Sequence, residues 1–98
     1  MTVKVMGLIE LQDASAFDLY RHQVGATVER YSGQVCARGM LGTLFWNELG
    51  CAPFSAFVEL SFPSTEHVRS WANSVEYQAL IPIRSKAMKL TLFSLQIE

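Results

Sequence analysis

The chain has 98 residues, of which half are hydrophobic and 17% are charged, and its net charge is −1 with histidine neutral. This length suits one domain, which we expect over residues 1–98. The Lys and Arg residues form no run of three, and no basic amphipathic stretch or long apolar run occurs. These features argue against nucleic-acid and membrane partners.

The first two predicted elements are a strand and a long helix. Residues 3–11 are rich in β-branched and long apolar side chains, which favours a strand. Asp13 then provides an N-cap, because its carboxylate can accept a hydrogen bond from a free N–H of the first helical turn. Apolar side chains recur at steps of three and four across residues 14–31, which predicts a helix with one buried stripe. Gly33 suits the left-handed position that ends such a helix.

Two strands joined by a loop are predicted next. Residues 34–46 favour a long strand with a bend or bulge at Gly39 or Gly42. Residues 47–53 carry the turn-forming residues of a hairpin loop, and residues 54–62 favour a third strand.

The last third of the chain is predicted to contain helices and a final strand. Ser64 is a suitable N-cap for a second helix. A further helical turn or two is expected from residue 74, and Pro82 should interrupt it, because proline lacks an N–H and clashes with the preceding turn. Residues 89–97 favour a fourth strand. The buried stripe of the second helix is expected to comprise Val68, Trp71, Ala72 and Val75.

This β-α-β-β-α-β order is typical of the ferredoxin-like α+β fold, in which both helices cover one face of a four-stranded antiparallel sheet. The other face of such a sheet should alternate polar with apolar side chains. Here it carries Met6, Leu8, Phe57 and apolar residues of the fourth strand. Because monomers rarely expose such a patch, we expect a homodimer whose two sheets pack face to face as a dimeric α/β barrel.

Several segments of the chain resemble one protein family. They are FDLYRHQVGATVERYSGQVCARG, FVELSFPSTEHVRSWANSVEYQ and an arginine seven residues after Tyr77. Along nearly its whole length the chain resembles the domain of unknown function 1330, a family in the dimeric α/β-barrel superfamily. The resemblance implies a ferredoxin-like fold and a dimer, and it implies no established activity. The positions that match the family's recurring pattern are Arg38, Gly39, Trp71, Glu76, Tyr77 and Arg84.

The chain also departs from the pattern of that family. Met40 replaces the second glycine of the usual RGG, Val75 replaces the proline before the EY pair, and Ser55 stands where a basic residue is usual. Pro82 lies inside the usual last helix. If the family shares a ligand that the missing basic residue binds, this chain binds a different ligand or none.

Three ionisable residues form the first candidate site. Glu10, Arg38 and Glu59 have the strand parity of the inner face of the predicted barrel, and their strands are expected to be neighbours. They should therefore converge in a cleft, where burial raises a carboxylate pKa and a nearby arginine lowers it, so that one acid could be ready for proton transfer. The alternative is a structural ion pair that fixes the dimer register, or a group of residues at a wet rim.

A second group of candidates lies on the helical side. Trp71 and Tyr77 could line a pocket between the helices and the sheet, although Trp71 also falls on the core stripe of its helix. Arg84 could bind a carboxylate through two hydrogen bonds, or it could pair with Glu76, and the pairing is favoured.

The remaining chemistry of the sequence is sparse. Cys36 and Cys51 are the only cysteines, and without a signal-peptide cleavage site we expect them to be thiols in the cytoplasm. No nucleophile motif, phosphate loop, dinucleotide fingerprint or metal-ligand spacing occurs, so no metal and no cofactor are expected.

Three functional hypotheses remain open at the level of sequence. The first is a homodimer that binds a small molecule in a pocket between sheet and helices. The second is a cofactor-independent enzyme of the oxygenase or isomerase type, since proton transfer needs only a shaped pocket and one or two well-placed groups. The third is a purely structural or regulatory dimer.

Overall fold

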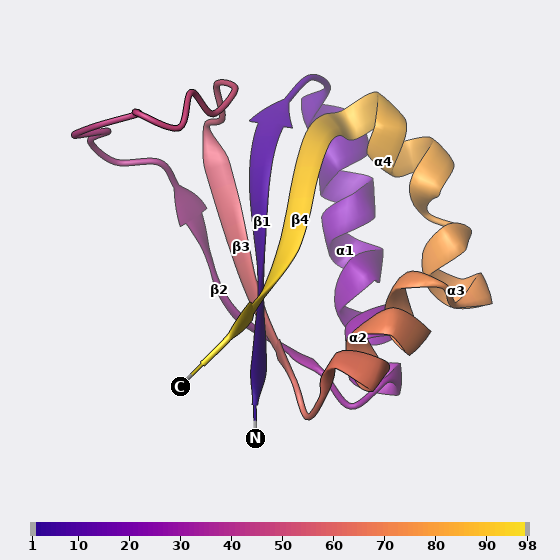
Figure 1. Ribbon diagram of the computed structural model, residues 1–98. Helices are drawn as coiled ribbons and strands as arrows, with labels where there is room; N and C mark the ends of the chain where they lie inside the picture. Colours follow the sequence, from indigo (N-terminus) through magenta and orange to yellow (C-terminus); the bar gives the residue numbers. More distant parts are fainter. Residues whose placement is uncertain (1, 98) are drawn as a thin grey trace.

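The computed structural model describes residues 2–97, which form one antiparallel sheet with a layer of helices on one face (Figure 1). The strand order is β2-β3-β1-β4, and all three neighbouring pairs are antiparallel. The arrangement is the predicted ferredoxin-like α+β fold. In chain order the elements are β1 (Val3–Leu11), α1 (Ala14–Arg30), β2 (Gln34–Met40), β3 (Ala56–Phe62), α2 (Thr65–Ala72), α3 (Val75–Gln78), α4 (Ile81–Ala87) and β4 (Met88–Gln96).

Short polar side chains fix where the helices begin. Asp13 accepts a hydrogen bond from the backbone N–H of Ala16 at 2.9 Å, and Ser64 accepts one from His67 at 3.3 Å. Ser74 caps α3 in the same way. Each side chain satisfies an N–H that has no partner within its helix. Both N-caps that the sequence predicted, Asp13 and Ser64, are confirmed.

The end of α1 differs from the prediction in one residue. The left-handed position belongs to Ser32, with φ of 67°, and not to Gly33. Gly33 is required by a close approach, because a Cβ there would lie 2.5 Å from the ring of Phe62. The glycine thus lets the end of α1 pack directly on β3.

The helical segment after β3 is broken more than the sequence indicated. α2 ends at Ala72 and a new helix begins after Ser74, so the helical phase restarts. Val75, predicted to be buried, is therefore 84% exposed. Pro82 lies in the first turn of α4, where its missing N–H has no helical partner in any case. The interruption predicted near Pro82 is found between α3 and α4.

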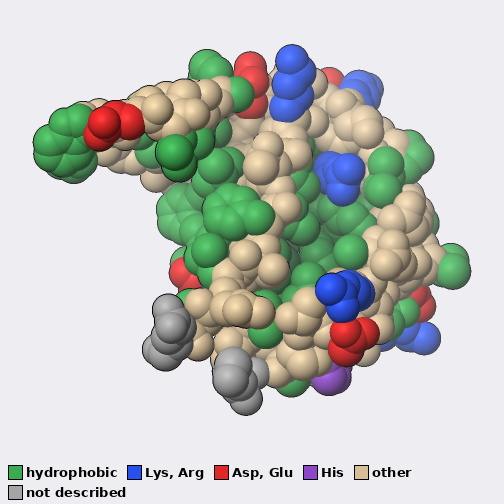
Figure 2. All heavy atoms as spheres, viewed as in Figure 1, with side chains coloured by type: hydrophobic (Ala, Val, Ile, Leu, Met, Phe, Trp, Pro, Cys, Tyr) green, Lys and Arg blue, Asp and Glu red, His purple; other side chains and the backbone are tan. Residues whose placement is uncertain are grey.

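Residues 41–55 form an arm that projects beyond the sheet. The predicted strand over 34–46 ends at Met40 instead, and the arm returns to the sheet where Ser55 donates to the carbonyl of Ile9. The side chain of Asn47 bridges the tip, accepting from the N–H of Cys51 and donating to its carbonyl. The arm lies on the side of the sheet away from the helices (Figures 1 and 2). Its most exposed apolar side chains are Phe45, Trp46 and Leu49.

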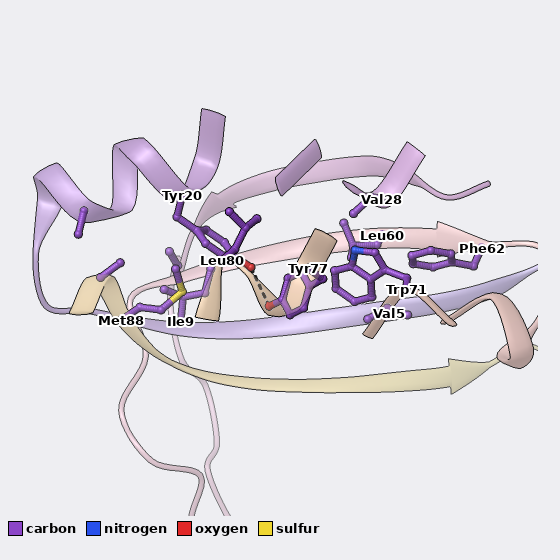
Figure 3. Packing of buried hydrophobic residues seen from close by; sticks show 13 residues of the cluster. Val5, Ile9, Tyr20, Val28, Leu60, Phe62, Trp71, Tyr77, Leu80 and Met88 are labelled. Atoms are coloured by element: carbon purple, nitrogen blue, oxygen red, sulfur yellow. Dashed lines mark hydrogen bonds between the residues drawn. The ribbon is translucent and has the colours of Figure 1, made fainter. Parts of the chain in front are cut away.

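The hydrophobic core fills the space between the sheet and the helices (Figure 3). Alternate residues of β1 point into it, and α1 contributes Tyr20 and Val28. Trp71 lies at its centre, with ring centroids 4.5 Å from Tyr77 and 5.5 Å from Phe62. We call this side of the sheet the helix face.

The opposite side of the sheet, which we call the outer face, is largely apolar. Strand register places Met6 opposite both Glu59 and Phe93, and Leu8 opposite Phe57. Leu95 lies on the same face, opposite Lys4. The predicted second apolar face is thereby confirmed. Among the helices of residues 2–97, none is long and apolar enough to cross a membrane.

Candidate functional site

A cavity of about 290 Å³ lies between the helix face of the sheet and the helices. Its walls come from all four strands, from α1, and from Trp71 and Tyr77. Hydrophobic side chains line the recess between the two layers in Figure 2. Small-molecule sites are concave and mostly apolar, with a few polar groups that orient the ligand. This cavity has that character, and its polar groups are Tyr20, Tyr77, Arg21 and Arg38.

The two tyrosines are joined within the cavity wall. The hydroxyls of Tyr20 and Tyr77 lie 2.9 Å apart, as the dashed line in Figure 3 marks. The guanidinium of Arg84 donates to the Tyr77 hydroxyl at 2.8 Å. Arg84 also lies over the Tyr77 ring, 5.6 Å from its centroid, in a cation–π contact. The three side chains form a connected polar chain at the edge of the core.

Trp71 belongs to both the core and the cavity wall. It is 1% exposed, and its indole N–H donates to the hydroxyl of Thr27 at 3.0 Å. The hydrogen bond satisfies the one polar atom of a ring that is otherwise packed among apolar groups. Trp71 and Tyr77 thus both line the recess, which was one of the two roles that the sequence left open for them.

A bulge in β2 decides where Arg38 points. Val35 pairs with Leu60 and Ala37 pairs with Glu59, so Cys36 is an extra residue on β2. An extra residue moves every later side chain to the other face of the sheet. Arg38, opposite Val58, therefore lies on the helix face and lines the cavity.

The predicted convergence of Glu10, Arg38 and Glu59 is wrong for this reason. Glu59 lies on the outer face, where it forms an ion pair with Lys4 at 3.2 Å, and this contact raises the pKa of the lysine. Glu10 is also on the outer face, opposite Lys89. The sheet separates both carboxylates from Arg38.

The favoured pairing of Arg84 with Glu76 is also wrong. Glu76 instead binds Arg30 at 2.8 Å and accepts a hydrogen bond from the hydroxyl of Tyr31. Its own backbone N–H, then Tyr31 and Arg30, lower the pKa of the Glu76 carboxyl. The side chain of Glu76 is held on the solvent side of α3, while Arg84 turns to Tyr77.

Tyr20 is a site residue that the sequence placed only on the apolar stripe of its helix. Its ring packs against Tyr77 edge to face, and its hydroxyl lies inside the cavity wall. The sequence did offer one indication, because a phenol on a buried stripe needs a hydrogen-bond partner for its hydroxyl. That partner is Tyr77 on α3, and the periodicity within α1 does not reveal it.

The Tyr20 hydroxyl should make folding sensitive to alkaline pH. Burial raises its pKa above the ordinary value of 10.0, the neighbouring Tyr77 adds to the rise, and the charges of Arg84 and Arg38 oppose it. Above about pH 10 the unfolded chain loses this proton and the folded protein keeps it, so stability falls as pH rises.

We therefore expect Tyr20→Phe to flatten the alkaline loss of stability. The free energy of unfolding in urea would be measured between about pH 9 and about pH 11 for both proteins. The wild type should lose up to about 1.4 kcal/mol per pH unit more than the variant, which is the effect of one proton. Parallel pH curves for the two proteins would contradict the burial of this hydroxyl.

Within residues 2–97 there is no group of three or more His, Cys, Asp or Glu side chains placed to hold a metal ion. Both cysteines are exposed thiols. Cys36 lies on the outer face beside Ser61, 3.3 Å from its hydroxyl.

The architecture and the cavity define a ferredoxin-like α+β protein with a recess between its two layers. Residues 4–96 match the family described as domain of unknown function (DUF1330), and the chain belongs to this family. No curated protein matches the chain.

Solved structures share the fold at low sequence identity. A protein of unknown function from Rhodopseudomonas palustris matches with a TM-score of 0.81 and 17% identity, over 99% of this chain and 82% of that one. SnoaB, a cofactor-independent oxygenase from Streptomyces nogalater, matches with a TM-score of 0.70 and 9% identity, over 99% of this chain and 93% of that one. A dimeric protein of unknown function and ferredoxin-like fold from Bacteroides fragilis matches with a TM-score of 0.59 and 13% identity, over 98% of this chain and 96% of that one. At these identities the likeness shows the fold alone.

Proposed function

We propose that the protein is a homodimer that binds a small, mostly apolar molecule in the cavity of each protomer. The observation that carries the binding proposal is the cavity itself, because apolar walls surround two phenols and two arginines. Its volume of about 290 Å³ is at the lower end of the range for ligand sites. The expected ligand is therefore compact, of the size of one or two fused rings.

The partner expected on the outer face is a second copy of the chain. That face presents Met6, Leu8, Phe57, Phe93 and Leu95, with the Lys4–Glu59 ion pair among them. The arm of residues 41–55 lies on the same side, so a second sheet packed there would also contact its exposed aromatic side chains. The dimeric state of the Bacteroides fragilis protein with this fold supports the same assembly.

Blocking the cavity should weaken ligand binding. Val24 of α1 lines the cavity, and Val24→Trp would place an indole in the space that a ligand needs. Binding of β-naphthol, followed by isothermal titration calorimetry, should weaken at least about tenfold, or about 1.4 kcal/mol. The matched control is Gln23→Trp, which adds the same ring to the exposed side of α1 and should leave binding unchanged.

The cavity proposal fails if the wild type does not bind β-naphthol, or if both tryptophan variants bind it as the wild type does. The first result would favour the purely structural or regulatory dimer. Thermal unfolding of Val24→Trp checks that the variant is folded. Native mass spectrometry of freshly purified protein adds an independent readout, since a retained small mass should be present in the wild type and absent from Val24→Trp.

A cofactor-independent enzyme of the oxygenase or isomerase type is the second candidate. The hydrogen-bonded series Arg84–Tyr77–Tyr20 favours this enzyme hypothesis, because linked hydroxyls beside a cation can hold or relay a proton at a bound substrate. SnoaB shares this fold, which supports the oxygenase hypothesis by analogy only. Oxygen uptake with naphthohydroquinone tests the oxygenase form. A rate above that of buffer, lost in Val24→Trp, would support it, and a rate equal to that of buffer would count against it.

A further inference from the structure

The hydrogen bonds at the cavity wall leave one hydroxyl proton without an acceptor. Each phenol has a single O–H to donate. The contact between Tyr20 and Tyr77 uses one of the two, and Arg84 occupies the Tyr77 oxygen from the other side by donating to it. Within residues 2–97 neither hydroxyl has another hydrogen-bond partner. One O–H therefore remains without an acceptor, whichever tyrosine donates to the other, and both tyrosines line the cavity.

The arginine determines which hydroxyl that is. A hydroxyl that accepts from a cation becomes a stronger donor and a weaker acceptor, because linked hydrogen bonds polarise one another. This polarisation favours Tyr77 as the donor to Tyr20, which leaves the free O–H on Tyr20. The favoured order of donation is Arg84 to Tyr77 to Tyr20, and it ends at a hydroxyl that can donate to a ligand.

The charged side chains that line the cavity, Arg21 and Arg38, are both cationic, and no Asp or Glu lines it among the described residues. Arg21 is paired with Asp18, which lies outside the lining, at 3.6 Å. Neither Arg38 nor Arg84 has a carboxylate partner within residues 2–97. Glu76 precedes Tyr77 in the sequence, but its carboxylate is bound to Arg30 and Tyr31. Arg38 and Arg84 are near enough to Tyr20 for their charges to act on its hydroxyl. The site therefore favours negative charge at the point to which Tyr20 donates.

We propose that the ligand carries one acidic oxygen and binds in its ionised form, as a phenolate or an enolate, with that oxygen on the Tyr20 hydroxyl. Arg38 supplies the compensating charge, and Arg84 acts as a positioning residue through Tyr77. A carboxylate fits less well, because its two oxygens offer about four acceptor positions to a single free O–H. This inference rests on the proposed binding of a small molecule in the cavity and names its chemical class.

The test uses para-nitrophenol, whose phenolate is yellow and whose neutral form is not. Bound to the wild type, the probe should ionise at lower pH than in buffer, by about one pH unit, which corresponds to about a tenfold preference for the phenolate. It should also bind about tenfold more tightly than para-nitroanisole, its uncharged methyl ether, and more tightly than para-nitrobenzoate. Tyr20→Phe and Arg38→Gln should each bring the apparent pKa of the probe back toward its value in buffer.

Three further variants separate recognition from stability. Tyr31→Phe makes the same chemical change at a phenol outside the cavity, where the lost hydrogen bond is to Glu76, and should leave the ionisation of the probe unchanged. Arg84→Gln should reduce the shift, and Arg84→Lys should restore part of it, because an ammonium can still donate to Tyr77.

Two results would overturn the inference. If para-nitrophenol and para-nitroanisole bind with equal affinity, or if Tyr20→Phe keeps the full shift in probe pKa, the oxyanion assignment is wrong. In either case, continued binding of β-naphthol that Val24→Trp blocks would leave the proposed cavity function intact. If no aromatic probe enters the cavity, β-naphthol included, both proposals fail together.

Discussion

Phe93→Asp is expected to dissociate the proposed dimer. Phe93 is 39% exposed on the outer face, where it lies opposite Met6 on the neighbouring strand. In a two-fold assembly each substitution occurs twice, so two carboxylates would lose water against an apolar surface. The dissociation constant should rise at least about 100-fold, or about 3 kcal/mol. Sedimentation velocity at roughly micromolar concentration would then show a monomer in place of a dimer.

The matched control for this change is Leu19→Asp. Leu19 is also an exposed apolar residue, but it lies on α1, on the opposite side of the molecule from the outer face. This variant should sediment as the wild type does. A wild-type protein that is monomeric at this concentration would refute the dimer, and dissociation by Leu19→Asp would place the interface on the helices.

Trp71→Ala should remove a large part of the stability of the fold. The side chain is fully buried, it packs between Phe62 and Tyr77, and it holds Thr27 through its indole N–H. Truncation of a buried tryptophan costs about 3–5 kcal/mol through lost apolar burial and the cavity that remains. A domain of this size has a free energy of unfolding of about 5–15 kcal/mol, so this loss would remove a large fraction of the total stability. Urea denaturation measures it.

Trp71→Phe separates ring packing from the hydrogen bond. Phenylalanine retains most of the aromatic contact and loses the donor to Thr27, so its cost should be clearly smaller than that of alanine. Thr27 still donates to the carbonyl of Val24, which limits the penalty at that hydroxyl. If Trp71→Ala unfolded within about 1 kcal/mol of the wild type, the central place of Trp71 in the core would be refuted.

Local chemistry made most of the fold predictable. The side chains of Asp13 and Ser64 indicate where α1 and α2 begin, because each can cap the first turn of a helix. The alternation of buried and less buried side chains along β1 distinguishes its two faces. The helix ends were less predictable. Val75 falls on the stripe of α2 by spacing alone, but the chain turns at Ser74 and the spacing no longer applies beyond it.

The candidate site was predictable only where it did not depend on strand register. Helix periodicity placed Trp71 on the buried stripe of α2, and Tyr77 was a candidate for the same recess without support from that spacing. Arg38 was assigned to the wrong face because parity along β2 assumes an unbroken ladder. The partner of Arg84 could not be derived either, since Tyr77 and Glu76 are adjacent in sequence and only the folded backbone directs one of them toward it.

The extra residue Cys36 in β2 has a consequence for how such proteins diverge. Deletion of its single codon would close the bulge and leave Val35, Ala37 and Arg38 opposite their present partners, so Arg38 would stay on the helix face. Arg38 would cross to the outer face only if Cys36 were retained and took a regular place in the ladder. An insertion or deletion at this position is thus absorbed by the bulge, and homologues that differ by one residue here would keep the cation in the recess.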